Sequence, residues 1–221
     1  MDDKQRAEVL EAALAQLLQP LKNIPFSTVV RSLSGHSITP VDRNNPADVE
    51  LIETLSEAAR LCGEAVRQKP ILRPRPNEVG NDIEPFVMRA VAATGLRCER
   101  PTTAGGQLKA TGYPDILVYD GAGRPTYLEC KIYSSDTANT SMRSFYLSPS
   151  DDFKVCREAR HLLMAFEMQA KATPNSRNSE YTAVAFKLVD LHDLLCDVKY
   201  EFNSDNRRLY TGNMVLASGK V

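Results

Sequence analysis

Two apolar runs joined by a five-residue turn constrain the fold of this chain more than any other feature. The runs PDILVYD (114–120) and TYLECKIY (126–133) are rich in β-branched and aromatic residues, which favour strands. The residues between them, GAGRP, have the glycine and proline composition of a turn. The sequence therefore predicts an antiparallel β-hairpin, which needs further strands or helices to bury its apolar face.

Outside the hairpin, many apolar residues recur at the spacing of α-helices. Asn45 is a good N-cap in front of Pro46, and Gly95 is a helix stop. Four helices are predicted: one that ends before Pro20, one from Pro46 to Val66, one from Asn81 or Asp82 to Gly95 with Pro85 in its first turn, and a long one from about 151 to 171. The segment 22–46 is mixed and loop-rich.

Two further strands are predicted beside the hairpin, LRCER at 96–100 and YTAVAFKLV at 181–189. From residue 77 onward the expected order is helix, three strands, helix and strand. This order is typical of an α/β core in which a central mixed β-sheet is flanked by helices. At the C-terminus, the runs VKYEF and RLYTG on either side of NSDN predict a second hairpin.

A proline-rich stretch, KPILRPRP at 69–76, divides the predicted helices into two groups. Its three prolines exclude a helix and favour an extended connection. We therefore expect an N-terminal helical subdomain, residues 1–76. Residues 77–221 are expected to form the core together with the C-terminal hairpin.

The net charge of −1, from 27 basic and 28 acidic residues, argues against a nucleic-acid partner when the chain is taken as a whole. The charges are unevenly distributed, however. Residues 1–66 carry 6 basic and 10 acidic side chains (−4), and residues 67–221 carry 21 and 18 (+3). The second part of the chain therefore permits an anionic partner such as DNA.

The cysteines lie more than 20 residues apart from one another, at Cys62, Cys98, Cys130, Cys156 and Cys196. This spacing argues against a zinc site or a disulfide framework and predicts mostly buried small side chains in a reducing compartment. No apolar run is long enough to cross a membrane, and the charged N-terminus does not resemble a secretory signal. We expect a cytoplasmic protein with no membrane partner.

The predicted hairpin places two carboxylates and an ammonium on one patch of sheet. Side chains alternate along a strand, so Glu129 and Lys131 point to one face and Cys130 to the other. Asp115 begins the antiparallel partner strand, which brings it back beside Glu129. A hard cation such as Mg²⁺ offsets the repulsion of adjacent carboxylates, and a lysine beside it can orient a water or stabilise a phosphate. The alternative is an exposed turn with a solvated Glu–Lys pair.

The residues Pro114-Asp115 and Glu129-Cys130-Lys131 resemble the catalytic signature of the PD-(D/E)xK nuclease superfamily, which includes type II restriction endonucleases and archaeal-type Holliday junction resolvases. The resemblance covers residues 78–190 and implies a restriction-endonuclease-like core. It also implies that Asp115 and Glu129 ligate one or two Mg²⁺ ions, that the backbone carbonyl of Cys130 is a further ligand, and that Lys131 activates or positions the attacking water.

The superfamily also uses an acidic residue on its first core helix, and this chain has two candidates there. Glu84 is followed by apolar residues at helical spacing and resembles the helix glutamate, which would hold a second metal ion or its water. Glu78 lies before the expected helix start and is kept in reserve. The structural alternative for Glu84 is an acid in the first helical turn, where the helix dipole favours it.

Several polar side chains are candidates for DNA contacts, because guanidinium, ammonium, amide and hydroxyl groups bind phosphates or base edges. These are Arg73 and Arg75 in the basic stretch, Gln107 and Lys109 in the glycine-rich loop, and Ser141, Arg143, Ser144 and Tyr146 in the polar loop after the hairpin. For each group the alternative is a solvated linker or a surface loop.

Together these features predict a type II restriction endonuclease that hydrolyses double-stranded DNA with Mg²⁺ at a short specific sequence and leaves 5′-phosphates. Cutting two antiparallel strands favours a homodimer, and the N-terminal subdomain, residues 1–76, is then suited to dimerisation or DNA contact. A cognate DNA methyltransferase is expected in the same system. The alternatives are a structure-specific or repair nuclease of the same superfamily, such as a junction resolvase, and a catalytically inactive DNA-binding module.

Overall fold

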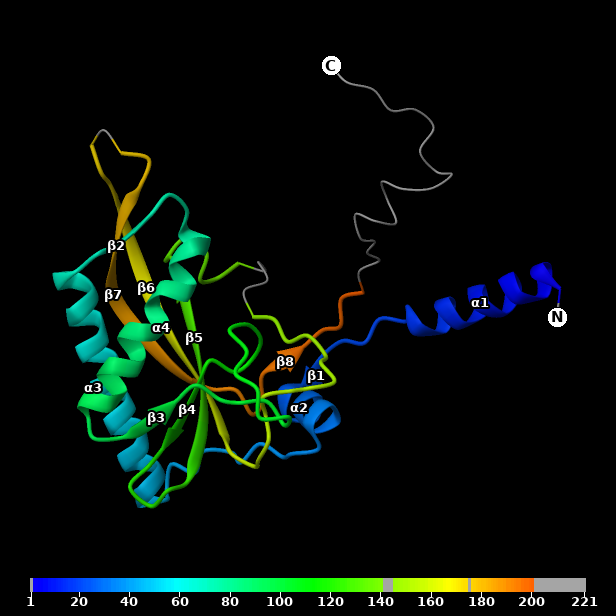
Figure 1. Ribbon diagram of the computed structural model, residues 1–221, viewed down its shortest axis with the longest axis horizontal. Helices are drawn as coiled ribbons and strands as arrows, with labels where there is room; N and C mark the ends of the chain where they lie inside the picture. The colour runs from blue at the N-terminus through cyan, green and yellow to red at the C-terminus, as the bar shows by residue number, and fades with distance from the viewer. Residues whose placement is uncertain (1, 141–144, 175, 201–221) are drawn as a thin grey trace. The chain divides into compact units, whose positions relative to one another are not determined.

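The computed structural model describes residues 2–140, 145–174 and 176–200, and the chain forms two compact units (Figure 1). The smaller unit comprises Met1–Ile24 and Cys196–Val221. It contains helix α1 (Asp3–Leu17), whose N-terminus is closed by a capping box between Asp2 and Gln5 and which buries none of its residues. The larger unit, Pro25–Leu195, contains the main sheet. Strands β1 (Ile24–Pro25) and β8 (Leu195–Cys196) form a separate two-stranded sheet.

The main sheet has six strands in the order β2-β7-β6-β5-β4-β3. Only the central β5–β6 pair is parallel, and the other four pairs are antiparallel. The expected mixed sheet is thereby confirmed. The strands are β2 (Ile71–Arg73), β3 (Arg97–Glu99), β4 (Ile116–Tyr119), β5 (Pro125–Tyr133), β6 (Arg160–Ala172) and β7 (Ser179–Asp190).

The hairpin predicted from the sequence is formed by β4 and β5, which pair in the register Ile116–Leu128. Its turn is closed by hydrogen bonds in which the Oδ1 atom of Asp120 accepts from the backbone N–H groups of Ala122 and Arg124, at 3.0 and 2.8 Å. An aspartate that binds its own downstream backbone in this way stabilises a tight turn. The turn therefore fixes the pairing of the two strands.

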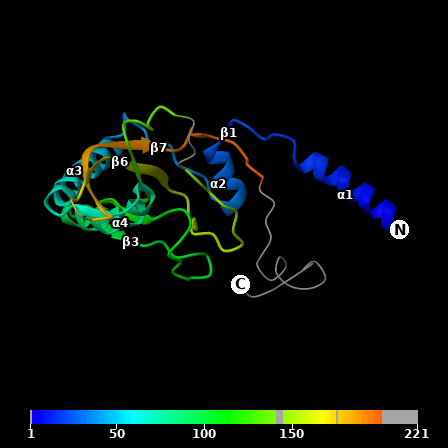
Figure 2. The ribbon, with the colours of Figure 1, turned by 90° about the horizontal axis from the view of Figure 1, so that it is seen from above.

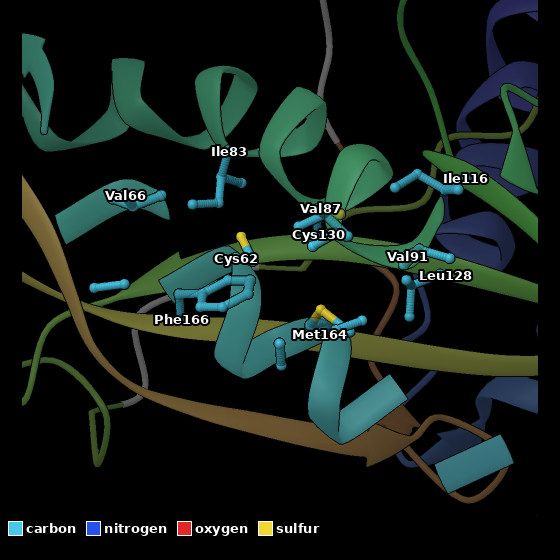
Figure 3. Close-up of a cluster of buried hydrophobic side chains, with 14 of the residues drawn as sticks. Cys62, Val66, Ile83, Val87, Val91, Ile116, Leu128, Cys130, Met164 and Phe166 are labelled. Atoms are coloured by element: carbon cyan, nitrogen blue, oxygen red, sulfur yellow. The ribbon is translucent and has the colours of Figure 1, made fainter. Parts of the chain in front are cut away.

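Helices α3 (Pro46–Gln68) and α4 (Pro76–Ala93) pack on one face of the sheet, and α2 (Phe26–Ser34) lies apart from them (Figure 2). Asn45 caps α3 as expected, because its side chain accepts from the Ala47 N–H at 3.0 Å. The buried cluster between these helices and the sheet includes Cys62 and Cys130 (Figure 3). All five cysteines are free thiols; these two are buried and the other three are half-buried.

The helix predicted over 151–171 is wrong, because residues 160–172 form strand β6. This strand lies between β5 and β7 and is buried on both faces over most of its length. A doubly buried strand carries a continuous apolar run, HLLMAFEM here, and such a run is not distinguished from a helix by its periodicity. The β5–β6 crossover therefore contains no helix among its described residues.

One helix begins earlier than predicted, and one helix was not predicted. Helix α4 begins at Pro76 rather than at Asn81 or Asp82, because a proline suits the first helical position. Pro85 consequently lies inside the helix instead of in its first turn, and Glu78 is part of the helix rather than ahead of it. Helix α2 begins at Phe26 within a segment that the sequence indicated as loop-rich.

The expected division at residue 76 separates α3 from α4 and β7. In the structure α3 packs against both of these elements. The extended stretch before it is not a linker but supplies the edge strand β2, which pairs with β7. The predicted C-terminal hairpin falls largely on residues 201–212, which lie outside the described residues. No described helix is long and apolar enough to cross a membrane.

A buried network of charges joins α3 to the sheet. The Asp48 carboxylate is 1% exposed and accepts from the guanidinium groups of Arg160, at 2.5 and 3.2 Å, and of Arg124, at 2.8 Å. Burial raises the pKa of Asp48, but hydrogen bonds from the Asp42 N–H and from both arginines outweigh it and hold the pKa below its usual value. Asp48 therefore links the helix to β6 and to the hairpin turn.

Replacing Asp48 should destabilise the protein strongly. Asp48→Ala leaves the Arg160 and Arg124 cations without this partner, and breaking a buried pair from one side costs about 3–5 kcal/mol. Urea denaturation of the two proteins measures the difference. Glu50→Ala, at an exposed position of the same helix, should change the free energy of unfolding by no more than about 0.5 kcal/mol. Equal effects of the two substitutions would contradict the role given to Asp48.

Candidate active site

The end of the β4–β5 ladder places Asp115 against β5. The last paired residues are Ile116 and Leu128, so the Cys130 N–H lies beyond the β4 ladder. The Oδ2 atom of Asp115 accepts from this N–H at 2.8 Å. The carboxylate is thus held beside the strand segment that carries Glu129 and Lys131, as the hairpin geometry predicts.

Glu129 and Lys131 lie on the same face of β5 and form an ion pair between Lys131 Nζ and Glu129 Oε1. Burial and the charge of Asp115 raise the pKa of Glu129 to about 7, although Lys131 acts in the opposite direction. For Lys131, burial acts to lower the pKa, because it disfavours the charged ammonium. The charge and the hydrogen bond of Glu129 outweigh this effect, and the pKa of Lys131 is raised. Lys131 is therefore held as an ammonium, a form that donates hydrogen bonds.

The second oxygen of Glu129, Oε2, is buried and has no hydrogen-bond partner among the described residues. A buried acceptor without a donor is costly unless something else satisfies it. No group of three or more His, Cys, Asp or Glu residues in the described ranges is arranged to hold a metal ion. Mg²⁺ is commonly bound by one or two carboxylates together with waters and substrate phosphates. The pair of Asp115 and Glu129 fits that mode of binding.

Glu84, on α4, belongs to the same electrostatic environment. Burial and the charge of Asp115 raise its pKa, whereas Arg100, Lys154 and Lys131 lower it. Glu78 lies in the first turn of α4, and its charge acts on Arg73. The charge of Glu84 therefore interacts with Asp115, whereas that of Glu78 acts on Arg73.

Lys154 is a site residue that the sequence reasoning missed. It is 6% exposed, and its Nζ donates to the carbonyl oxygens of Gly112 at 2.8 Å and Pro114 at 3.3 Å, directly before Asp115. Burial lowers the pKa of Lys154, while Asp115 and the two glutamates of the site oppose this. Lys154 comes from the irregular crossover that was expected to be helical, so no spacing rule connects it with the signature.

The remaining predicted site residues are distributed over several elements. The Cys130 side chain is buried in the core, and only its backbone faces Asp115. Arg73 pairs with Asp82, and Lys109 pairs with Asp152, so both cations already contact carboxylates. Arg75, Gln107 and Tyr146 are exposed, and Ser141, Arg143 and Ser144 lie outside the described residues.

The raised pKa of Glu129 predicts a pH-dependent stability in the absence of divalent ions. A group whose folded pKa, about 7, exceeds its ordinary value of 4.5 stabilises the fold fully below pH 4.5 and loses this effect as the pH rises through 7. Glu129→Gln carries a neutral group at every pH. The melting temperature of the variant minus that of the wild type should therefore grow between pH 5 and 8 in EDTA. A difference that stays constant over this range would show that Glu129 is not perturbed.

The sequence matches a known family over residues 20–213, which include every element of the site; the family is described as the Type II restriction enzyme MjaV family. The chain is also similar to a curated protein from Methanocaldococcus jannaschii, which bears the name Type II restriction enzyme MjaV. The two are 36% identical over 231 aligned residues, and the alignment covers 98% of this chain and 97% of that protein.

Proposed function

The chain belongs to the Type II restriction enzyme MjaV family, and from this premise we propose that Asp115, Glu129 and Lys131 form its catalytic centre. The protein is a type II restriction endonuclease, a site-specific deoxyribonuclease. The observation that supports the location of the centre is the meeting of Asp115 with the Glu129–Lys131 pair at the end of the hairpin. The same pattern supports membership of the PD-(D/E)xK superfamily.

In the proposed mechanism, Asp115 and Glu129 would hold Mg²⁺, the Cys130 carbonyl would be a further ligand, and Glu84 would hold a second ion or its water. The bound metal supplies an acidified water and neutralises charge on the leaving 3′ oxygen. Lys131 donates from its ammonium group, which orients the attacking water or stabilises charge on the phosphate. The products carry 5′-phosphates.

The face of the sheet that carries Glu129 and Lys131 becomes exposed toward β7, where Ala185, Lys187 and Val189 are exposed, and this supports DNA as the substrate. Helices α3 and α4 cover the opposite face, where Cys130 is buried. On the Glu129 face, α2 packs at the sheet end, where Phe26 lies edge-on against Tyr113 with ring centroids 5.4 Å apart. Farther along, Lys131 lies opposite Ala165, and Ala165 lies opposite the exposed Lys187. This row of residues spans three strands on one face.

Lys187 is well placed to contact the DNA backbone in this arrangement. Its Nζ lies 5.0 Å from the ring centroid of Tyr133, which follows Lys131 on the same face of β5. Ala165, which is itself buried, separates the two lysines in this row. We propose that the row from Lys131 to Lys187 follows one strand of the bound duplex.

A homodimer would bring two such centres to the two antiparallel strands of a duplex. Helix α1 exposes apolar side chains that a second surface would bury, since Val9, Leu10 and Leu17 are 58%, 55% and 61% exposed. We propose that residues of the N-terminal region contribute to dimerisation or DNA contact. A cognate methyltransferase completes the proposed restriction system.

Removing either carboxylate of the centre should abolish cleavage. Asp115→Asn and Glu129→Gln keep the side-chain shape but take away a charged metal ligand, and several kcal/mol of lost transition-state stabilisation correspond to a rate decrease of about 10³-fold or more. The measurement is digestion of plasmid DNA with Mg²⁺, in which the wild type should give discrete fragments. Glu50→Gln, on the exposed face of α3, is the matched control. Wild-type activity in Asp115→Asn would exclude this centre.

Removing Lys187 should weaken DNA binding without a change of sequence preference. A lysine that neutralises one phosphate contributes about one unit to the slope of log K against log salt. Lys187→Ala should reduce that slope by about one, when binding is measured with Ca²⁺ in the Glu129→Gln background. Lys69→Ala, an exposed lysine at the end of α3, should leave the slope unchanged. An unchanged slope in Lys187→Ala would place the DNA elsewhere.

A further inference from the structure

Lys154 is a buried cation without a direct acidic partner among the described residues. Its side chain is 6% exposed, and the hydrogen bonds of its ammonium group go to two backbone carbonyls. Lysines are almost never buried to this extent unless a carboxylate pairs with them, because a buried charge without a counter-charge is costly. The charges that stabilise its protonated form belong to Asp115, Glu129 and Glu84. Lys154 is therefore coupled to the three carboxylates assigned to metal binding.

The two carbonyls that Lys154 binds belong to the first and the last of the three residues directly before Asp115, Gly112 and Pro114. The middle one, Tyr113, is buried and hydrogen-bonds through its hydroxyl to Nδ1 of His161 at 2.6 Å. On the other side of this segment, Asp115 accepts from the Cys130 N–H. The chain ahead of Asp115 is thus attached to β6 by Tyr113, to β5 by Asp115, and to the β5–β6 crossover by Lys154.

We propose that Lys154 is a positioning residue of the active site, and this inference rests on the proposed metal-binding role of Asp115 and Glu129. Its two hydrogen bonds fix the backbone from which the Asp115 carboxylate extends. Its positive charge, together with that of Lys131, balances the gathered carboxylates and keeps them in place for a divalent ion. Because it is buried behind this segment, Lys154 acts through Asp115 and does not contact DNA.

Lys154 would contribute in two ways, through its hydrogen bonds and through its positive charge. Three substitutions distinguish these two contributions. Lys154→Arg keeps the charge and a donor, Lys154→Gln keeps a donor without the charge, and Lys154→Met removes both. Partners that orient metal ligands typically contribute 10–100-fold to metal affinity or activity. A residue that serves only the stability of the fold would lower the amount of folded enzyme without changing its requirement for metal.

The experiment uses the full-length protein and measures the rate of plasmid cleavage as a function of Mg²⁺ concentration. A second readout, without DNA, is the Mg²⁺ concentration at which the melting temperature has risen half-maximally, and it should shift in the same direction as the first. Lys154→Met and Lys154→Gln should raise the Mg²⁺ concentration for half-maximal rate by about 10-fold or more, with the KM for DNA unchanged. Lys154→Arg should restore it to within a few-fold of wild type. Lys171→Met, at the exposed end of β6, should behave as wild type.

Three results would overturn the inference. One is a Lys154→Gln protein with the wild-type Mg²⁺ requirement, and another is an increase in KM for DNA at unchanged Mg²⁺ dependence, which would indicate a phosphate contact. The third is a loss of activity in every variant that only follows its loss of folded protein by circular dichroism. If Lys154→Met does not fold, the Gln and Arg proteins decide. Failure of the proposed centre itself is seen separately, because Asp115→Asn would then cleave like the wild type.

Discussion

The register of the β4–β5 hairpin is the constraint on which the proposed active site depends. Ile116 and Leu128 are the last residues that pair in the β4–β5 ladder. Asp115 therefore lies just beyond the ladder, where its carboxylate accepts a hydrogen bond from the Cys130 N–H. Because side chains alternate along β5, the same register directs Cys130 into the core and Glu129 to the opposite face. A shift by one residue would exchange these faces and bury the charged groups among apolar side chains.

Burial of this patch carries an electrostatic cost that the surrounding charges only partly offset. Desolvation and Asp115 together raise the pKa of Glu129 to about 7, while Lys131 and the more distant Lys154 act in the opposite direction on the carboxylates around them. The divalent ion proposed for this patch would remove the repulsion between the carboxylates and satisfy the Oε2 atom of Glu129. Affinity for a metal ion and the instability of the metal-free patch have the same physical origin.

The parts of the fold that local sequence determines were predicted well. The hairpin, the start of α3 and the strand β7 follow from turn chemistry, an N-cap and a β-rich composition, all of which act over a few residues. The strand β6 was mistaken for a helix, because burial on both faces removes the alternation that identifies a strand. The early start of α4 was missed because two prolines and a glycine obscured its periodicity.

The sequence by itself determined the hairpin and, through it, the meeting of Asp115 with Glu129 and Lys131, since the three residues are linked by one turn and the alternation of one strand. Only the tertiary structure brought Glu84 into charge interaction with Asp115, and it added Lys154. Glu84 and Lys154 come from elements that contact the hairpin through packing across long sequence separations. Neither the spacing of apolar residues nor a helix-capping residue encodes such a contact. It depends on how the whole sheet and its helices pack together.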